Sequence, residues 1–244
     1  MLGALGYEKS NLETPADVTV YSGEELKKTG ANDVANALKY KAGVYFTQMG
    51  PHDQSFITGN STLSLRGIKG GTLVLINGVP ASFNNVSHLD MLNLDTVEKV
   101  EVVKGGGAVL YGSEAYGGVI NVITKSEYKN SLHIAAGNKG QRDYSAAIGA
   151  GKLGVTLGRN EMGETGILTQ KQGTKTINGV RVPYYTGFGD SKKDHLGVSY
   201  KFDDKLSFNY MFNKKKYTND YLSTDKSKIH QIDKYNLNHF AQQH

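Results

Sequence analysis

This chain contains acidic, basic and histidine residues, but their spacing matches no catalytic motif. The seven histidines are spread from His52 to His244, and only His239 and His244 lie near each other. The chain has no cysteine, no His-Glu-x-x-His zinc motif, no Gly-x-Ser-x-Gly elbow and no Walker phosphate loop. We therefore expect no catalytic residues, no metal site, no cofactor and no enzymatic activity.

One glycine-rich turn has the composition of a phosphate-binding loop. Val100–Val103 predicts a strand, and Lys104–Gly107 follows it directly, as in dinucleotide-binding folds. The third glycine of that fingerprint would fall at Leu110, which is not a small residue. Only about 15 residues separate the strand from Val119, too few for a packed crossover helix. The glycines therefore indicate tight turns between short strands.

The first half of the chain, up to about Lys125, mixes helix and strand signals. Ser22 and Glu25 have capping-box spacing, which predicts a helix start. A second helix is predicted from Asn32 to about Lys41, ended by a glycine. The predicted strands are Val18–Tyr21, Leu63–Leu65, Leu73–Ile76, Val97–Val103 and Val119–Ile123. Together these elements predict a small α+β domain.

Beyond Lys125 the helix signals stop, and apolar residues alternate with polar ones as in half-buried strands. Residues 196–202 and 206–212 alternate in this way with a very short link, which predicts an antiparallel hairpin. A second hairpin is predicted for residues 144–157, and residues 158–194 are a long polar stretch. Short turns alternating with a long connection are typical of transmembrane barrels, although a soluble β-sandwich gives the same alternation.

Composition favours β-structure and gives no sign of nucleic-acid binding. The chain holds 30 glycines and 15 tyrosines, and no apolar run approaches the roughly 20 residues of a membrane-spanning helix. The formal net charge is +5, but the lysines are scattered. We interpret the one dense run, Lys214–Lys216, as a solvated loop after a strand. Because Met1–Gly6 lacks the features of a signal peptide, we expect that the signal has been removed or that the gene is longer.

Five segments together resemble the plug domain of TonB-dependent outer-membrane receptors. They correspond, in the family's order, to its LRG, VLVLIDGVP, IERIEVLRGP, ALYGS and GGVINIITK stretches, and here comprise residues 65–67, 73–80, 97–106, 109–113 and 117–125. Asn77 replaces the family's usual aspartate. The similarity runs continuously from about Pro15 to Lys125.

The resemblance implies an α+β plug domain followed by antiparallel transmembrane strands of a 22-stranded β-barrel. It divides the chain into an N-terminal segment 1–14, a plug 15–126 and the first, truncated part of the barrel, 127–244, with about six strands. An open sheet of that size would leave unpaired edges in lipid, so we hypothesise that the sequence is a fragment or truncated reading frame of a longer parent.

The resemblance also implies a receptor in the outer membrane of a diderm bacterium. Such receptors take up a scarce nutrient such as a ferric siderophore, haem or cobalamin, with energy from the TonB complex. The implied partners are that complex, a metal-chelate, haem or cobalamin-type ligand and outer-membrane lipid, but no nucleic acid. The family's TonB box is not visible in residues 1–14.

Individual roles follow from the same resemblance. Arg66, Glu101 and Lys104 match positions that lock the plug to the barrel, although Lys104 lacks the planar fork of the usual arginine. Apical loops expected to contact substrate correspond to residues 47–60 and 81–90. Their candidate residues are Gln48, His52, Phe83, Asn84, Asn85 and His88. The glycines expected at structural turns are Gly67, Gly78, Gly105, Gly112, Gly117 and Gly118.

A second class of function stays open at this point. The chain would then be a non-transporting, plug-like module that binds a ligand or a protein partner and uses its β-ribbon for association. Heat-resistant migration of a barrel in detergent gels would favour the receptor. A monodisperse soluble monomer would favour the module.

Overall fold

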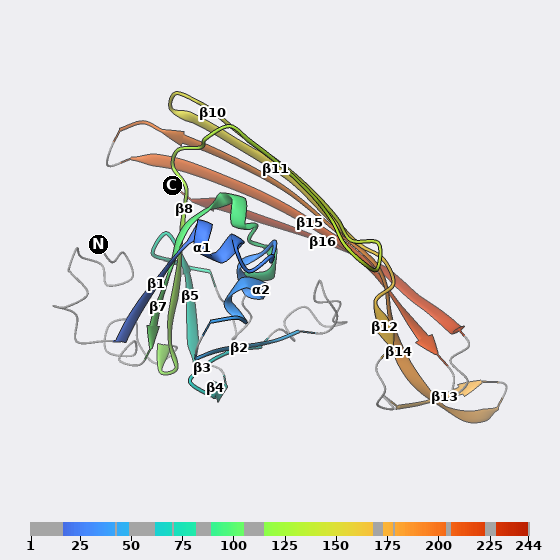
Figure 1. Cartoon of the computed structure of the whole chain (residues 1–244). Helices are drawn as coiled ribbons and strands as arrows, with labels where there is room; N and C mark the ends of the chain where they lie inside the picture. The colour runs from blue at the N-terminus through green and yellow to red at the C-terminus, as the bar shows by residue number, and fades with distance from the viewer. Residues whose placement is uncertain are drawn as a thin grey trace.

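The structure, a computed structural model, describes residues 17–41, 43–48, 62–69, 71–81, 89–104, 115–167, 173–177, 179–203, 206–222 and 228–243. These residues form two layers: a small α+β layer and a long, curved antiparallel sheet that passes along one side of it (Figure 1). Within these ranges, no helix is long and apolar enough to cross a membrane.

The two α-helices of the α+β layer begin at side-chain caps. Ser22 caps α1 (Gly23–Lys27), and its hydroxyl accepts a hydrogen bond from the Glu25 N–H at 3.1 Å, as the sequence predicts. The Glu25 carboxylate accepts from Lys41 at 2.7 Å. Asp33 caps α2 (Val34–Leu38) in the same way, which makes this helix shorter than predicted. The chain leaves α2 through a turn that reaches a left-handed glycine, Gly43 (φ 79°).

Five strands form the central sheet of this layer, and all five predicted strands of the first half are confirmed here or in the smaller sheet. The order is β1 (Asp17–Ser22), β7 (Val97–Lys104), β8 (Gly118–Thr124), β5 (Thr72–Ile76) and β6 (Val79–Pro80). Every residue of β5 is buried, which explains its unbroken apolar run. Asn77 (φ 49°) and Gly78 (φ 83°) form the two-residue turn from β5 to β6.

The smaller elements complete the core of the α+β layer. A second sheet contains β2 (Val44–Thr47), β3 (Thr62–Leu65) and β4 (Ile68–Lys69), and two 3-10 turns, η3 (Leu89–Met91) and η4 (Leu94–Thr96), precede β7. Side chains from both helices, both turns and the central sheet pack together. Those with 2% exposure or less include Leu26, Val34, Leu38, Leu89, Leu94, Val100 and Val102. Burying these apolar side chains is what holds the layer together.

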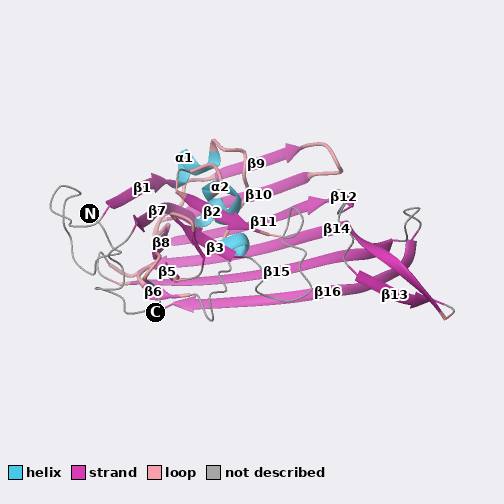
Figure 2. Ribbon diagram, turned by 90° about the horizontal axis from the view of Figure 1, so that it is seen from below, coloured by secondary structure: helices cyan, strands magenta, loops and turns pink. Residues whose placement is uncertain are grey.

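The long sheet is antiparallel throughout, and its main strands follow one another in sequence order (Figure 2). They are β9 (Ser131–Ala136), β10 (Arg142–Ala150), β11 (Leu153–Met162), β14 (Val180–Lys201), β15 (Ser207–Leu222) and β16 (Lys228–Gln243). Two short strands, β12 (Gly166–Ile167) and β13 (Gly173–Ile177), pair with β14 beside this path. Both predicted hairpins are confirmed as β10–β11 and β14–β15.

Two sequence interpretations of the second half are wrong. The polar stretch 158–194 is largely strand, because cross-strand ion pairs such as Arg159–Asp194 (2.6 Å) and Lys192–Glu161 (3.2 Å) let polar residues extend the ladder. The lysine run 214–216 is not a loop either. It lies within β15, where the middle lysine is buried and bonded to an aspartate of the α+β layer.

Candidate functional site

The two faces of the long sheet have opposite polarity. Successive side chains of a strand point to opposite faces. The face buried against the α+β layer is mainly polar, and its buried residues include Asp143, Ser145, Thr156, Asn160, Lys193, His195, Ser199, Asn213 and Lys215. The other face has an exposed apolar region, formed by Leu132, Ile134, Tyr144, Ile148, Leu153, Leu157, Leu196 and Tyr200. Beyond this region the same face carries the ion pairs Arg159–Asp194 and Lys192–Glu161. A continuous exposed apolar surface marks contact with a membrane or another protein.

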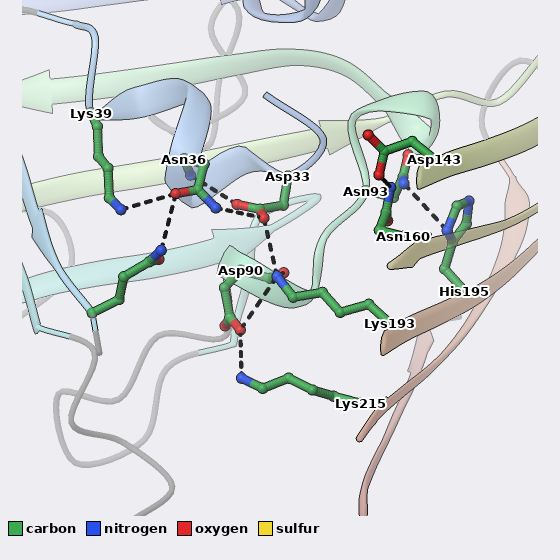
Figure 3. A network of polar contacts seen from close by, with 11 residues as sticks. Asp33, Asn36, Lys39, Asp90, Asn93, Asp143, Asn160, Lys193, His195 and Lys215 are labelled. Atoms are coloured by element: carbon green, nitrogen blue, oxygen red, sulfur yellow. Dashed lines mark hydrogen bonds and ion pairs between the residues drawn. The ribbon is translucent and has the colours of Figure 1, made fainter. Parts of the chain in front are cut away.

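Four buried charges join the α+β layer to the polar face, as Figure 3 shows. Lys193 on β14 donates to the Asp33 carboxylate at 3.1 Å and to the Asp90 carbonyl oxygen at 2.9 Å. Lys215 on β15 donates to the Asp90 carboxylate at 3.1 Å. All four side chains are at most 10% exposed. We call Asp33, Asp90, Lys193 and Lys215 the four-charge cluster. Its two acids and two bases balance, which a buried group of charges requires.

Asparagine side chains extend this contact along the sheet. The Asn93 amide lies 3.2 Å from Nδ1 of His195, while its oxygen accepts from the Asp95 N–H at 2.7 Å. On the sheet itself, Asn160 donates to the Asp143 carboxylate at 2.9 Å (Figure 3). The polar residues therefore form a network that belongs to both layers.

Asp95 makes a further link between the layers. Its carboxylate lies 2.8 Å from the Lys27 ammonium. Burial raises the pKa of Asp95, but hydrogen bonds from Lys27 and from Ser145 on β10 outweigh burial, so the pKa lies below its ordinary value. Asp95 is therefore held ionised at neutral pH in contact with both layers.

A cavity of about 1030 Å³ lies between the α+β layer and strands β9 to β11. Its lining includes Lys27, Asp95, Lys125, Tyr128 and Asp143. Burial, followed by the neighbouring charge of Lys27, lowers the pKa of Lys125. Burial, with the charge of Asp95, raises the pKa of Tyr128 to about 12. The walls are mixed in character, since Leu94, Leu132 and Ala147 also line the cavity. Among the described residues, no group of three or more His, Asp or Glu side chains is placed to hold a metal ion.

The three expected locking residues lie in different surroundings. Arg66 is exposed in the turn between β3 and β4, with a left-handed backbone (φ 54°). Glu101 is fully buried in β7, where it accepts from Lys99 at 2.7 Å and from the Asn121 amide at 3.2 Å. Lys104 is half-buried at the end of the same strand. These two contacts of Glu101 lie within the central sheet, and Arg66 lies in a turn of the smaller sheet.

Of the expected substrate-facing residues, only Gln48 is among the described residues. It is half-buried, and its amide donates to the Asn36 side-chain oxygen at 3.2 Å. His52, Phe83, Asn84, Asn85 and His88 lie outside the described residues.

The expected turn glycines divide into two groups. Gly67 (φ 79°) and Gly78 (φ 83°) are in turns, and a Cβ at either would meet open space. Gly117 and Gly118 are buried at the start of β8, and Gly118 has a φ of 135°. A Cβ there would lie 2.4 Å from the Val103 carbonyl oxygen, so the strands can pack this closely only at glycine. Gly105 and Gly112 lie outside the described residues.

Sequence reasoning missed the four-charge cluster, although one signal pointed to it. The alternation that puts Leu196, Val198 and Tyr200 on one face puts Lys193 on the other, together with His195. The same argument places Lys215 opposite the apolar residues of β15. Two lysines on a strand face that is buried require acidic partners, which the sequence does not identify.

Comparison with known proteins identifies relatives for both layers. Residues 10–119 match the family described as the TonB-dependent receptor plug domain. Over 211 residues the chain is 29% identical to a vitamin B12 transporter of Vibrio cholerae, covering 82% of the chain and 33% of the transporter. Over 185 residues it is 34% identical to a hemin receptor of Yersinia enterocolitica, covering 73% of the chain and 25% of the receptor. The chain thus spans a third or less of the length of these relatives.

A solved structure has the same fold at low sequence identity. The ferripyoverdine receptor of the Pseudomonas aeruginosa outer membrane superposes with a TM-score of 0.58 and 14% identity. The match covers 91% of this chain and 28% of the receptor. It therefore includes the long sheet as well as the α+β layer.

Proposed function

We propose that the chain belongs to the TonB-dependent receptor family and is part of an outer-membrane receptor that takes up a scarce nutrient. The nutrient class is a ferric siderophore, haem or cobalamin. Two relatives support this range, since one is a vitamin B12 transporter and the other a hemin receptor. Uptake would use energy from the TonB complex and would involve no covalent chemistry.

The polarity of the long sheet is the observation that carries this proposal. Its apolar face is exposed, with Leu132 at 75% and Ile148 at 53%, while its polar face is buried against the α+β layer. A soluble β-sandwich would show the reverse, because its apolar faces pack together. Transmembrane barrel strands direct apolar residues to lipid and polar residues to the lumen. The observed polarity therefore favours strands in lipid with a plug in the lumen.

We extend the proposal to the domains. Residues 15–126 are the plug and residues 127–244 the first part of a 22-stranded transmembrane barrel, after an N-terminal segment 1–14. Closure of the barrel by further strands would remove the edges of the sheet, which lipid does not tolerate.

The roles of individual residues remain part of the proposal. Arg66, Glu101 and Lys104 are proposed to lock the plug to the barrel, and the segments 47–60 and 81–90 to face the substrate. Burial of Glu101 supports a structural role for its charge, since a fully buried carboxylate requires partners.

The experiment is an uptake assay in the native bacterium, with a strain that lacks the gene as control. Cells receive a labelled ferric siderophore, haem or cobalamin, with and without a protonophore that removes the energy TonB uses. An antibody against residues 15–125 locates the protein and reports its size.

We expect the protein in the outer-membrane fraction, with uptake of at least one nutrient lost in the deletion strain and on de-energising the cells. A soluble, monodisperse protein with unchanged uptake of all three nutrients would contradict the proposal. That result would favour a plug-like binding module.

A further inference from the structure

Lys193 and Lys215 face each other directly across β14 and β15. The strand register pairs the two residues, and they are only 8% and 3% exposed. Like charges opposite each other on one face destabilise a sheet, and burial removes the water that would screen them. This position on the long sheet therefore requires negative charge nearby.

The α+β layer supplies negative charge at this position. Asp33 and Asp90 accept from the two ammonium groups at 3.1 Å each. Their segments are bonded to each other, since the Val34 N–H donates to the Leu92 carbonyl and the Leu94 N–H to the Asn32 carbonyl. Because the segments are joined, any movement of this part of the layer takes both carboxylates away from the lysines together.

A polar cavity of about 180 Å³ lies beside Lys193. Its lining includes Asp33 and the side-chain amides of Asn36, of Gln141 just before β10, and of Asn160 on β11. Each of these amides donates one hydrogen bond to an aspartate, Asn36 to Asp33 and the other two to Asp143, and has a second N–H. Amide N–H groups can hydrogen-bond an anion, and a water molecule occupies only about 30 Å³ of liquid. The cavity therefore has room for a carboxylate or phosphate group. It shares lining residues, Gln141 and Asn160 among them, with the larger cavity of about 1030 Å³.

We infer that Lys193 and Lys215 form an anion-binding site on the barrel wall, which Asp33 and Asp90 occupy in the described conformation. A ligand that carries carboxylate or phosphate groups takes their place when this part of the plug moves away. The inference rests on the proposed function in one respect, the movement of the plug relative to the wall. Ligand and plug carboxylates bind the same ammonium groups, so anion binding favours plug displacement and displacement favours anion binding.

A single-cysteine reporter tests this inference on the native protein in detergent. The chain has no cysteine, so Met91→Cys, a buried position beside Asp90, reacts with a charged thiol reagent only when the plug segment leaves the wall. Protein with the natural Met91 supplies the background. Succinate is the probe, because its two carboxylates match the two lysines, and chloride at equal ionic strength is the reference. The labelling rate should rise with succinate concentration and then level off. At a succinate concentration ten times its dissociation constant for the displaced state, we expect the rate to be about tenfold higher.

The matched control uses the neighbouring pair of lysines. Lys192 and Lys216 are also opposite each other in the β14–β15 register, but both are exposed. K193Q/K215Q should lose the succinate effect, and K192Q/K216Q should keep it. D33N/D90N/K193Q/K215Q, which removes acids and bases together and so avoids uncompensated buried charge, should also give a rate that succinate does not change.

The outcomes separate this inference from the proposed function. A wild-type labelling rate that ignores succinate, in a protein that takes up its nutrient normally, would refute the anion site and leave the receptor function intact. A succinate effect that persists in K193Q/K215Q would refute it as well. A succinate effect that depends on the two lysines, in a protein that imports none of the nutrients, would support the site and contradict the proposed uptake.

Discussion

Asp33 has two separable roles, and substitution of this one residue distinguishes them. Its carboxylate caps α2 by accepting from the Asn36 N–H at 2.8 Å, and it also accepts from the buried Lys193 at 3.1 Å. Asp33→Ser keeps a capping hydroxyl but is too short to reach the lysine. Asp33→Ala loses both contacts. Ser22→Ala removes a cap that lies on the exposed side of α1, and serves as the control.

The structure gives a magnitude for each substitution. Loss of a helix cap costs about 1 kcal/mol. Removing one partner of a buried ion pair costs roughly 3–5 kcal/mol. The lower end applies here, because Lys193 keeps its hydrogen bond to the Asp90 carbonyl oxygen. We therefore expect about 3 kcal/mol for Asp33→Ser, about 4 kcal/mol for Asp33→Ala and about 1 kcal/mol for Ser22→Ala.

The assay is urea unfolding of the native protein in detergent. The chain contains no tryptophan, so Phe46→Trp in the core of the α+β layer introduces a fluorescent reporter for that layer. Linear extrapolation of the unfolding curves gives the free energy of unfolding of each variant in the same reporter background.

Two results would contradict these expectations. If Asp33→Ser lies within about 0.5 kcal/mol of the parent, the size of an ordinary surface substitution, the bond to Lys193 contributes no stability. If Asp33→Ala costs no more than Ser22→Ala, Asp33 acts as a cap alone. In either case, the claim that buried charges join the α+β layer to the long sheet would fail.

Three further predictions concern the strands, the membrane face and pH. Gly118→Ala should lower the free energy of unfolding by more than about 3 kcal/mol, because backbone strain and a clash with a backbone oxygen add up. Gly78→Ala is strained but its Cβ meets open space, so it should lower this free energy by only about 1–2 kcal/mol. Leu157→Lys places a charge on the exposed apolar region of the long sheet, which should destabilise the folded protein by about 2–4 kcal/mol if the residue lies at mid-membrane. The heat-resistant folded fraction on detergent gels should fall, and an unchanged fraction would contradict contact of Leu157 with lipid. Because the pKa of Asp95 is lowered, its stabilisation is full above its ordinary pKa of about 3.9 and lost as pH falls through the lower folded value. The urea midpoint should therefore fall more steeply in acid for the parent than for Asp95→Asn; parallel curves would contradict this.

Local elements of the fold were predictable because short-range interactions determine them. Ser22 caps α1 through a residue three positions away, and Asn77-Gly78 turns the chain between adjacent strands. The glycine requirement at Gly118 was expected, but its cause was not. A backbone oxygen of β7 approaches too closely for any Cβ, and that contact comes from strand pairing.

The limits of the two predicted helices and of the polar stretch 158–194 depended on tertiary contacts. α2 begins only at Val34, because Asp33 is used as its cap and as a partner of Lys193 on the long sheet. Polar residues such as Arg159 and Asp194 continue the strands because they pair with each other across the sheet. Hydrophobic periodicity carries no information about such pairs.

The amino-acid order was enough to predict which residues of β10, β11, β14 and β15 share a face, because side chains alternate along every strand. It also carried the ordered motifs by which the plug domain was recognised. Packing of the long sheet against the α+β layer makes the polar face the buried one, and no local pattern predicts this. Only the tertiary structure brought Lys193 to Asp33, 160 residues away, and Lys215 to Asp90, 125 residues away. Alternation of side chains with a period of two separates a polar face from an apolar one, but it does not determine which face packs against the rest of the chain.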